Sequence, residues 1–235
     1  METKDIVKGL SSYTTCDVAD ALSKLKVAHG GFLAGLTMYY DLRWSPRRQE
    51  GTTKIVGPAH TVKYVRKNYE SEPTPPEHYL DNVPSGSVVF ISAPARAINA
   101  CYGGLMSTQA QYSGVVGTVI DGRLRDLQEH RDMEFPVFAR DVGTTAPAEA
   151  MRVAAINEPV WLNSEDQDAT INPGDILVGD INGVVVIPRS MAEKVLELIP
   201  SQVEADEKVA ADIRKGRPVQ EAQKEHRANV KKPKM

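Results

Sequence analysis

Residues 103–143 read GGLMSTQAQYSGVVGTVIDGRLRDLQEHRDMEFPVFARDVG, and this stretch decides the fold. It alternates helical patterns with apolar runs that are typical of strands buried on both faces. With the preceding run SVVFISA it predicts strand 87–93, helix 104–113, strand 115–121, helix 123–130 and strand 136–140. Alternating strands and helices predict a parallel α/β sheet.

From about residue 152 the pattern changes to short β runs at close spacing, namely RVAAI, PVWLN, ILVGDI and GVVVIP. Asn182-Gly183 lies between the last two runs and is a strong signal for a hairpin turn. This part of the chain therefore predicts further strands that are antiparallel rather than connected by helices.

A long helix is predicted over residues 190–215, close to the end of the chain. Ser190 is the expected N-cap, and Gly216 and Pro218 are the expected stop signals. Pro200 lies inside this helix and is expected to kink or divide it, because proline has no N–H to donate.

The first part of the chain contains one helix and one strand with clear signals. In TTCDVADALSKLK, Thr14 or Thr15 is the expected N-cap, and Asp17 lies in the first turn, where the helix dipole favours a carboxylate. Residues 53–65 have the composition of a strand, with Gly57-Pro58 as a break or bulge.

Two connections have no strong periodicity. Residues 30–50 predict a long surface loop, of the kind that is often functional or disordered. Residues 68–86 are rich in Pro, Glu and Ser, but Tyr79, Leu80 and Val83 suggest a short helix that anchors this connection to the core. The fold class expected from the whole pattern is α/β, with mixed sheets flanked by helices.

A chain of 235 residues can form one domain or two small ones. We see neither an internal repeat nor a linker, so we expect a single domain over residues 1–235, with its last helix at about 190–215 and a tail at 217–235. Hydrophobic residues make up 41% and charged residues 25%, which is the balance of an ordinary globular protein.

The net charge of −3 gives no overall attraction to nucleic acid or to an anionic membrane. The C-terminal segment is locally basic, and we expect a solvated tail there, with a nucleic-acid-binding arm as the alternative. Its cationic residues are Lys224, Arg227, Lys231, Lys232 and Lys234.

Cys16 and Cys101 lie far apart and match no metal-ligand spacing, so both are expected to be reduced and buried in the core. The sequence has no signal-peptide pattern and no apolar run long enough to span a membrane. A cytoplasmic protein without disulfides is the resulting expectation.

The residues with the clearest chemical meaning are Arg125, Asp126 and Glu129, which follow the strand that ends at Asp121-Gly122. If the next helix begins near Arg123, then Arg125 and Asp126 lie in its first turn, at the carboxyl end of a strand, where ligands of open α/β sheets bind. A single carboxylate plus water is a typical Mg²⁺ site, and Glu129 could hold one of the waters.

A second turn between a strand and a helix contains Gly103, Gly104, Leu105 and Met106. Glycines there let backbone N–H groups approach a carboxylate, and Arg125 adds a planar guanidinium for carboxylate or enolate oxygen. Each feature alone also fits a plain interpretation, a surface ion pair or a tight loop. Their combination at strand ends favours a binding site.

Residues 103–143 resemble the 4-hydroxy-4-methyl-2-oxoglutarate aldolases and their RraA-like (regulator of RNase E activity A) relatives. The family pattern G-x20-R-D-x2-E/D is satisfied by Gly104, Arg125, Asp126 and Glu129. The resemblance extends more weakly to VGPAHTVK and to NPGDILVGDINGVVVIP, so it covers most of the chain. Residues 37–50 are longer than the usual family loop, which puts substrate preference in question.

The resemblance implies a swivelling α/β/β sandwich that assembles as a homotrimer or hexamer, with active sites at subunit interfaces. It implies a class II pyruvate aldolase in which Arg125 binds the pyruvyl group and Asp126 ligates Mg²⁺, Mn²⁺ or another divalent metal, with Glu129 bound through water. The backbone of Gly103, Gly104, Leu105 and Met106 would hold the substrate carboxylate.

The expected reaction is cleavage of 4-hydroxy-4-methyl-2-oxoglutarate or 4-carboxy-4-hydroxy-2-oxoadipate to pyruvate and a second oxo acid, with decarboxylation of oxaloacetate as a side activity. Arg125 would stabilise the enolate oxygen, and a metal-linked water is the expected base. The distal end of the substrate could meet a neighbouring subunit's C-terminal helix, for which Glu204 and Glu207 are possibilities.

Two other classes of protein stay open. A regulator without catalytic activity would bind an RNA-processing partner, although the metal-binding Asp126 favours catalysis. A phosphoryl-carrier domain would need a histidine in a glycine-rich turn, and only His29, beside Gly30-Gly31, offers one. The remaining histidines lack ligand-like spacing and are not expected to bind the metal: His60, His78, His130 and His226.

Overall fold

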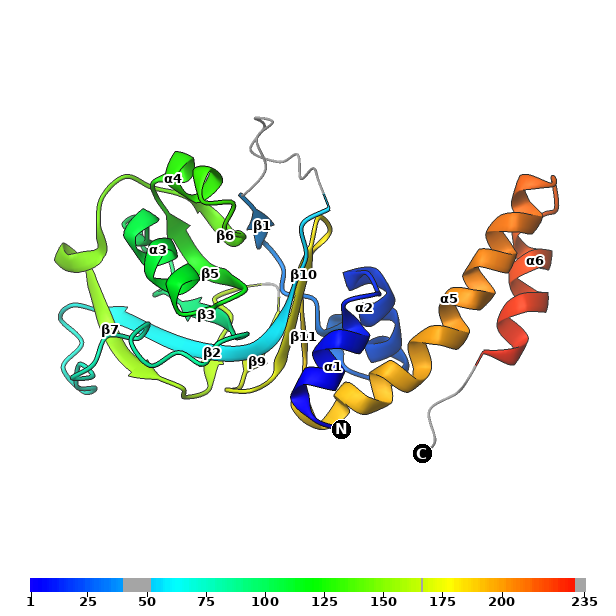
Figure 1. The fold of residues 1–235 in the computed structure, drawn as a ribbon, viewed down its shortest axis with the longest axis horizontal. Coiled ribbons are helices and arrows are strands. Elements are labelled where there is room, and N and C mark those ends of the chain that lie inside the picture. The colour runs from blue at the N-terminus through cyan, green and yellow to red at the C-terminus, as the bar shows by residue number, and fades with distance from the viewer. Residues whose placement is uncertain (40–51, 166, 231–235) are drawn as a thin grey trace.

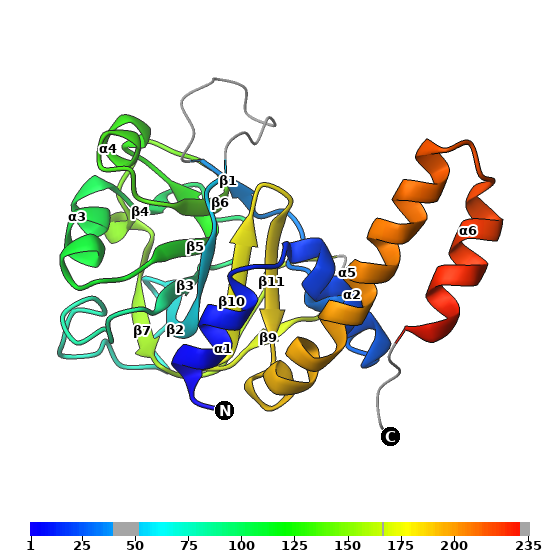
Figure 2. The same ribbon diagram turned by 45° about the vertical axis from the view of Figure 1, so that its right-hand side comes forward.

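The computed structural model describes residues 1–39, 52–165 and 167–230. In this part of the chain, nine strands form one mixed sheet, with helices on its outside (Figures 1 and 2). The strands of this sheet are β1 (Thr37–Met38), β2 (Ile55–Arg66), β3 (Val88–Ser92), β4 (Ala100–Tyr102), β5 (Gly117–Leu124), β6 (Val137–Val142), β7 (Met151–Ile156), β10 (Ile176–Asp180) and β11 (Gly183–Ile187). A separate two-stranded sheet contains β8 (Val160–Trp161) and β9 (Thr170–Ile171).

The sheet has the order β1-β6-β5-β3-β2-β10-β11, with β4 on β5 and β7 on β2. Its centre is parallel, since β2, β3, β5 and β6 all pair in the same direction. The outer pairs β1–β6, β2–β10, β2–β7 and β10–β11 are antiparallel. Because β1 also lies against β11, the sheet nearly closes on itself, and the predicted α/β class with mixed sheets is confirmed.

The predicted break in the long strand β2 is wrong. Pro58 and Gly57 stay in the ladder opposite Ile176 and Leu177 of β10, and the register shifts later, between Lys63 and Tyr64. Gly57 instead allows a close approach of another segment, because a Cβ there would lie 2.4 Å from the Gly86 carbonyl oxygen. The hairpin predicted at Asn182-Gly183 is present as β10–β11.

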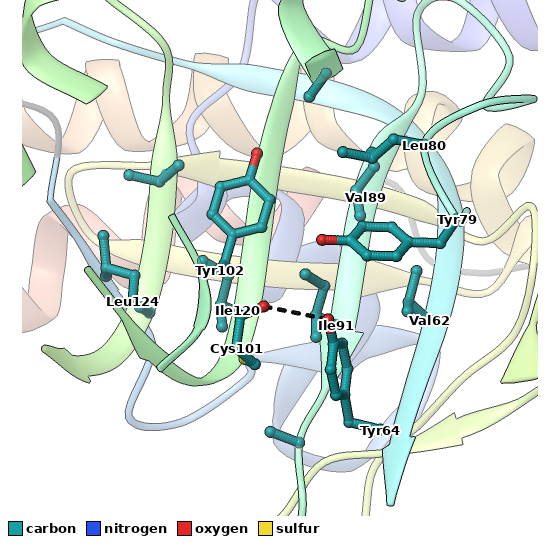
Figure 3. Close-up of a cluster of buried hydrophobic side chains, with 14 of the residues drawn as sticks. Val62, Tyr64, Tyr79, Leu80, Val89, Ile91, Cys101, Tyr102, Ile120 and Leu124 are labelled. Atoms are coloured by element: carbon teal, nitrogen blue, oxygen red, sulfur yellow. Dashed lines mark hydrogen bonds between the residues drawn. The ribbon is translucent and has the colours of Figure 1, made fainter. Parts of the chain in front are cut away.

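The segment between β2 and β3 is anchored to the core without the predicted short helix. Its residues form turns, because four prolines (Pro73, Pro75, Pro76 and Pro84) remove backbone donors that a helix would need. The three apolar residues expected to anchor the segment are buried: Tyr79, Leu80 and Val83. Figure 3 shows Tyr79 and Leu80 in a cluster that also contains Tyr64, Tyr102 and Ile120.

The helices are α1 (Thr3–Leu10), α2 (Thr15–Lys24), α3 (Gly104–Tyr112), α4 (Leu127–Asp132), α5 (Ala192–Arg214) and α6 (Val219–His226). Helices α1, α2 and α5 share an apolar cluster with the β10–β11 hairpin, and α3 and α4 lie on the other side of the sheet (Figure 1). None of the helices in the described ranges is long and apolar enough to cross a membrane.

Helix α2 begins as predicted, with Thr14 as its N-cap. The Thr14 Oγ1 accepts from the Asp17 N–H at 3.2 Å, and the Asp17 carboxylate accepts from the Thr14 N–H at 2.8 Å. The expectation for the cysteines is half right. Cys101 is buried in β4, but Cys16 is exposed, because it lies on the face of α2 that turns away from the sheet.

The C-terminal region differs from the prediction in three places. Helix α5 begins at Ala192 after a short 3₁₀ turn, so Ser190 is not its cap, and the helix continues through Pro200. Gly216, with a φ of +88°, ends α5 as predicted. The expected tail contains helix α6, which packs on α5, and the pair extends away from the sheet (Figure 2). Lys231, Lys232 and Lys234 lie outside the described residues, as does the part of the predicted loop after residue 39. Residues 30–39 contain strand β1 and the buried Leu33 and Leu36, so the prediction of a surface loop is wrong there.

Candidate active site

The site begins where strand β5 ends, and the strand is longer than the sequence predicted. Asp121 and Gly122 lie inside β5, because the strand continues to pair with β6 through Arg123 opposite Asp141 and Leu124 opposite Val142. Helix α4 starts only at Leu127. Arg125 and Asp126 therefore lie in the link between strand and helix, and their predicted place in the first helical turn is wrong.

The Asp126 carboxylate contacts the N-terminus of α3, although Asp126 itself directly precedes helix α4. Its backbone is left-handed, with φ +63° and ψ +42°, a conformation that aspartate tolerates better than most residues. This turn brings Asp126 Oδ2 to 3.0 Å from the Gly104 nitrogen, which donates to it, and to 3.3 Å from Arg125 Nε. One carboxylate thus meets both a helix N-terminus and a guanidinium, where negative charge is favoured.

Gly103 and Gly104 leave the space that two carboxylates occupy. A Cβ on Gly103 would lie 2.5 Å from Asp126 Oδ2, and a Cβ on Gly104 would lie 1.7 Å from Glu129 Oε2. Both positions have room only for glycine while these carboxylates stay in place. The structure therefore brings Gly103, Gly104, Asp126 and Glu129 together, as the pattern in the sequence suggested.

Arg125 is held by its backbone and keeps part of its side chain exposed. Its N–H donates to the Tyr102 carbonyl at 2.9 Å, and its Nη1 donates to the Thr144 carbonyl at 3.4 Å. Its side chain is 39% exposed, beside the 29% exposed Asp126. The guanidinium is therefore accessible to a ligand while its orientation is restricted from two sides.

A buried hydrogen-bond network stabilises the link between β5 and α4. His130 Nε2 donates to the Arg125 carbonyl at 2.7 Å, so its Nδ1 is the acceptor for the Ser107 hydroxyl at 2.9 Å. The Tyr102 hydroxyl lies 3.1 Å from Ser107 Oγ and 3.0 Å from Thr118 Oγ1. Burial lowers the pKa of His130 and raises that of Tyr102 to about 12, so both are neutral near pH 7.

A cavity of about 270 Å³ opens beside these groups. Arg125 and Asp126 line it, as do Gly103, Leu105 and Met106 of the predicted glycine turn. Within the described residues the Leu105 N–H has no partner, because the first hydrogen bond of α3 comes from a later residue. The residues that line the cavity therefore include one with a free backbone donor, one with a guanidinium and one with a carboxylate. His78 and Tyr64 also line it, and the sequence analysis did not identify either as a site residue.

The residues present fit a divalent cation that keeps most of its water. The carboxylates of Asp126 and Glu129 lie next to Gly103 and Gly104 and supply hard oxygen ligands. The Gly104 N–H and Arg125 both bind Asp126 Oδ2, which leaves Oδ1 for a cation. In the described ranges no group of three or more His, Cys, Asp or Glu side chains is arranged to hold a metal. Such a donor set suits Mg²⁺ or Mn²⁺ better than Zn²⁺, which takes three or four protein ligands.

A second polar cluster contains Asp121 of β5 and Arg140 of β6, and the sequence analysis missed it. The fully buried Asp121 carboxylate accepts from Arg140 Nε and from the Asn163 N–H, and burial raises its pKa against the opposing effect of Arg140. These residues line a cavity of about 480 Å³. The sequence features that could have identified this cluster are an aspartate after an apolar run and an arginine in the next predicted strand.

His29 lines neither of the two cavities described above. It is exposed in the 3₁₀ turn Ala28–Gly31, with a φ of +51°, after the end of α2. The four histidines that were not expected to bind the metal lie in different places: His60 in β2, His78 at the cavity, His130 in α4 and His226 in α6. His226 pairs with Asp212 of α5 at 2.8 Å.

Comparison with known proteins defines the class to which this fold and site belong. A model of the RraA-like family, described as Aldolase/RraA, matches residues 15–186, and the chain belongs to this family. Protein DlpA of Legionella pneumophila is 31% identical over 225 residues, which cover 94% of this chain. The chain spans about a third of DlpA, since the match covers 34% of that protein.

Two further proteins relate the chain to named members of the family. A protein of Halalkalibacterium halodurans named "Putative 4-hydroxy-4-methyl-2-oxoglutarate aldolase" is 31% identical over 163 residues, covering 66% of this chain and 69% of that protein. The structure of Streptomyces coelicolor RraAS2, described as an unusual member of the RNase ES inhibitor RraA family, superposes with a TM-score of 0.71 and 23% identity, over 91% of this chain and 96% of that one. At this identity the likeness supports the fold alone.

Proposed function

We propose that the protein is a divalent-metal-dependent lyase, a class II aldolase that cleaves 4-hydroxy-2-oxo dicarboxylic acids to pyruvate and a second oxo acid. The substrates proposed are 4-hydroxy-4-methyl-2-oxoglutarate or 4-carboxy-4-hydroxy-2-oxoadipate, and decarboxylation of oxaloacetate is the proposed side activity. The observation that carries the proposal is the Asp126 carboxylate, held at the start of α3 beside the accessible guanidinium of Arg125. The name of the relative in H. halodurans gives additional support.

The polar groups at and beside the cavity have distinct roles in the proposed reaction. Arg125 binds the oxo-acid end of the substrate and places positive charge where negative charge develops on the enolate oxygen. The N–H of Leu105, which follows the glycine turn at Gly103 and Gly104, binds the substrate carboxylate. Asp126 would hold Mg²⁺ or Mn²⁺ directly, with Glu129 acting through water, and the bound cation would supply Lewis-acid stabilisation of the enolate.

Asp126→Asn is the direct test of this proposal. The variant keeps the size of the side chain but removes the charge that would bind the cation, so pyruvate release should fall by about 100-fold or more while the melting temperature stays near that of wild type. Pyruvate is measured by coupling to lactate dehydrogenase. Asp132→Asn, at the exposed end of α4, is the matched control and should retain full activity. Activity that survives in Asp126→Asn, or in excess chelator, excludes the metal role.

The alternative is a regulator without catalytic activity, because the matched family is described by both aldolase and RraA. That function predicts binding to an RNA-processing partner and no pyruvate from any oxo acid. The same coupled assay separates the two, since a regulator would give no signal with either proposed substrate or with oxaloacetate at any Mg²⁺ or Mn²⁺ concentration.

We also propose that the chain works as a homo-oligomer, a trimer or hexamer. Three large apolar side chains near the site are unusually exposed: Ile98 at 79%, Leu105 at 77% and Tyr112 at 88%. Leu105 and Tyr112 share the outer face of α3, and exposed apolar groups that gather on one face are typical of an interface. Helix α5, which carries Glu204 and Glu207, lies with α1 and α2 on the β10–β11 hairpin, away from α3 (Figure 1), so a role for either glutamate at the site would require a neighbouring subunit.

A further inference from the structure

His78 is exposed, yet its ring is held in one orientation. It lies in the turns between β2 and β3 and stacks on Tyr79, with the two ring centroids 4.5 Å apart and the planes 28° from parallel. Tyr79 belongs to the buried cluster drawn in Figure 3 and is 3% exposed, so it forms a rigid platform for the histidine. The ring of His78 is therefore positioned more like a site residue than like a free surface side chain.

The hydrogen bonding of His78 determines what it can offer a ligand. The Leu80 N–H donates to His78 Nδ1 at 3.2 Å. Nδ1 must then carry a lone pair, so the proton of the neutral ring lies on Nε2. In this tautomer Nε2–H is a hydrogen-bond donor. It can bind an anionic oxygen, but it cannot act as a base that removes a proton.

His78 lines two cavities, the one of about 270 Å³ beside Arg125 and another of about 220 Å³. His78 lines the same cavity as Arg125 and Asp126, and so do Ala100, Met106 and Pro147. Tyr64 contributes no free hydroxyl, because that group donates to the Cys101 carbonyl at 3.3 Å (Figure 3). Among the described residues that line the cavity, His78 and Arg125 are the side chains that can donate to an anion. A dicarboxylate whose oxo-acid end lies at Arg125 needs a second donor, and His78 supplies it.

We propose that His78 is a specificity-determining residue whose Nε2–H binds the distal carboxylate of a dicarboxylic 2-oxo acid. This assignment rests on the proposed function, since it takes the oxo-acid end of the ligand to lie at Arg125 and Asp126. It assigns a protein group to the second carboxylate of the dicarboxylic acids proposed above. An acid of the same length with an apolar end gains nothing from His78.

Binding of two matched acids in the presence of Mg²⁺ tests this assignment without relying on turnover. The probes are 2-oxoglutarate, which has the distal carboxylate, and 2-oxopentanoate, which has a methyl group at that end. By isothermal titration calorimetry the His78→Ala variant should lose about tenfold or more in affinity for 2-oxoglutarate, as expected for a hydrogen bond to a charged group, and none for 2-oxopentanoate. His78→Gln, which keeps an N–H donor, should recover part of the loss.

The controls separate this proposal from the proposed function. Asp81→Asn changes an exposed neighbour that does not line the cavity and should bind both acids like wild type. Equal weakening of both acids by His78→Ala, or no change in either, overturns the role of His78. If Asp126→Asn abolishes binding of both acids while His78→Ala changes neither, only the His78 assignment falls. If the wild-type protein binds neither acid with Mg²⁺, both proposals fall.

Discussion

Two adjacent glycines decide how closely two carboxylates can approach helix α3. A Cβ on Gly104 would lie 1.7 Å from Glu129 Oε2 and 2.9 Å from Glu129 Cβ, so Gly104→Ala must push this side chain away. We expect the free energy of unfolding of the variant to be lower by about 1 to 3 kcal/mol, the usual cost of overpacking. We also expect the variant to bind Mn²⁺ more weakly. Urea denaturation measures the first effect and Mn²⁺ titration the second.

A double-mutant cycle shows whether the clash with Glu129 causes the loss. In Gly104→Ala combined with Glu129→Ala most of the clashing atoms are absent, so the double variant should be more stable than the sum of the two single effects predicts. Simple additivity would mean that the glycine serves some other purpose.

The buried ion pair of Asp121 and Arg140 is expected to contribute to stability rather than to chemistry. The Asp121 side chain is fully buried and the Arg140 side chain is 27% exposed. Asp121→Asn leaves a largely buried guanidinium without its counter-charge, and we expect it to lower the free energy of unfolding by about 2 to 3 kcal/mol, less than for a fully buried pair. Chemical denaturation at pH 7 measures this, and a loss below about 0.5 kcal/mol would place the pair among ordinary surface ion pairs.

At the residue scale the sequence indicated groups that the fold brings together, but it did not indicate their geometry. The spacing of Gly104, Arg125, Asp126 and Glu129 was sufficient to bring them into one site. The left-handed conformation of Asp126 was not predictable, because aspartate has no strict preference for it and nearby pairing of β5 determines where the strand ends. His78 was missed because its segment has no periodicity, and only the folded chain brings it to the cavity.

At the scale of elements, the link between β5 and α4 depends on a histidine that must stay neutral. His130 donates from Nε2 to the Arg125 carbonyl and accepts at Nδ1 from Ser107, and burial lowers its pKa below the ordinary 6.5. As the pH falls through about 6.5 the unfolded chain takes up a proton that the folded chain resists. The unfolded state then binds more protons, so stability must fall toward acid pH.

Replacing this histidine should therefore change the pH dependence of folding. Between pH 7 and pH 5 the wild type should lose stability, and His130→Gln should lose less over the same range, although it is less stable at pH 7. Burial also lowers the pKa of His60, so part of the pH dependence of stability should remain in both proteins. Urea unfolding at several pH values gives the comparison, and identical slopes for the two proteins would contradict it.

Elements with strong local signals were predicted well, and those set by tertiary pairing were not. The capped helix α2, the buried strand β3 and the β10–β11 hairpin follow from a capping box, a continuous apolar run and an Asn-Gly turn. The start of α4 was placed too early, since pairing of Arg123 and Leu124 with β6 extends β5. Helix α6 was missed because its short, polar sequence is stabilised by packing on α5, where Ala222 is fully buried.

At the scale of the whole molecule, the α/β class with mixed strand directions was predictable, but the near closure of the sheet was not. The alternation of strands and helices around residues 87–140 determines the parallel centre. The closure depends on β1 and on β2, whose successive parts pair with β10, β3 and β7, and no local pattern encodes such a change of partner.

The exposed apolar face of α3 gives a prediction for assembly. If Leu105 and Tyr112 lie in an interface between copies, Tyr112→Lys should shift the mass measured by light scattering from an oligomer toward a monomer, because a charge would be buried there. Gln111→Lys, which is exposed on a different side of the same helix, is the control for added charge. A wild-type protein that is monomeric at micromolar concentration would contradict the proposal.

The central claim is that Asp126 binds a divalent cation beside Arg125, and a crystal structure of the full chain with Mn²⁺ and oxalate tests it most directly. Oxalate mimics the enolate of pyruvate but does not react. We predict an anomalous Mn²⁺ peak at about 2.1 to 2.2 Å from an Asp126 carboxylate oxygen, with oxalate within reach of Arg125 and of the Leu105 N–H. A cation bound elsewhere, or no cation at this turn under saturating Mn²⁺, would contradict the account.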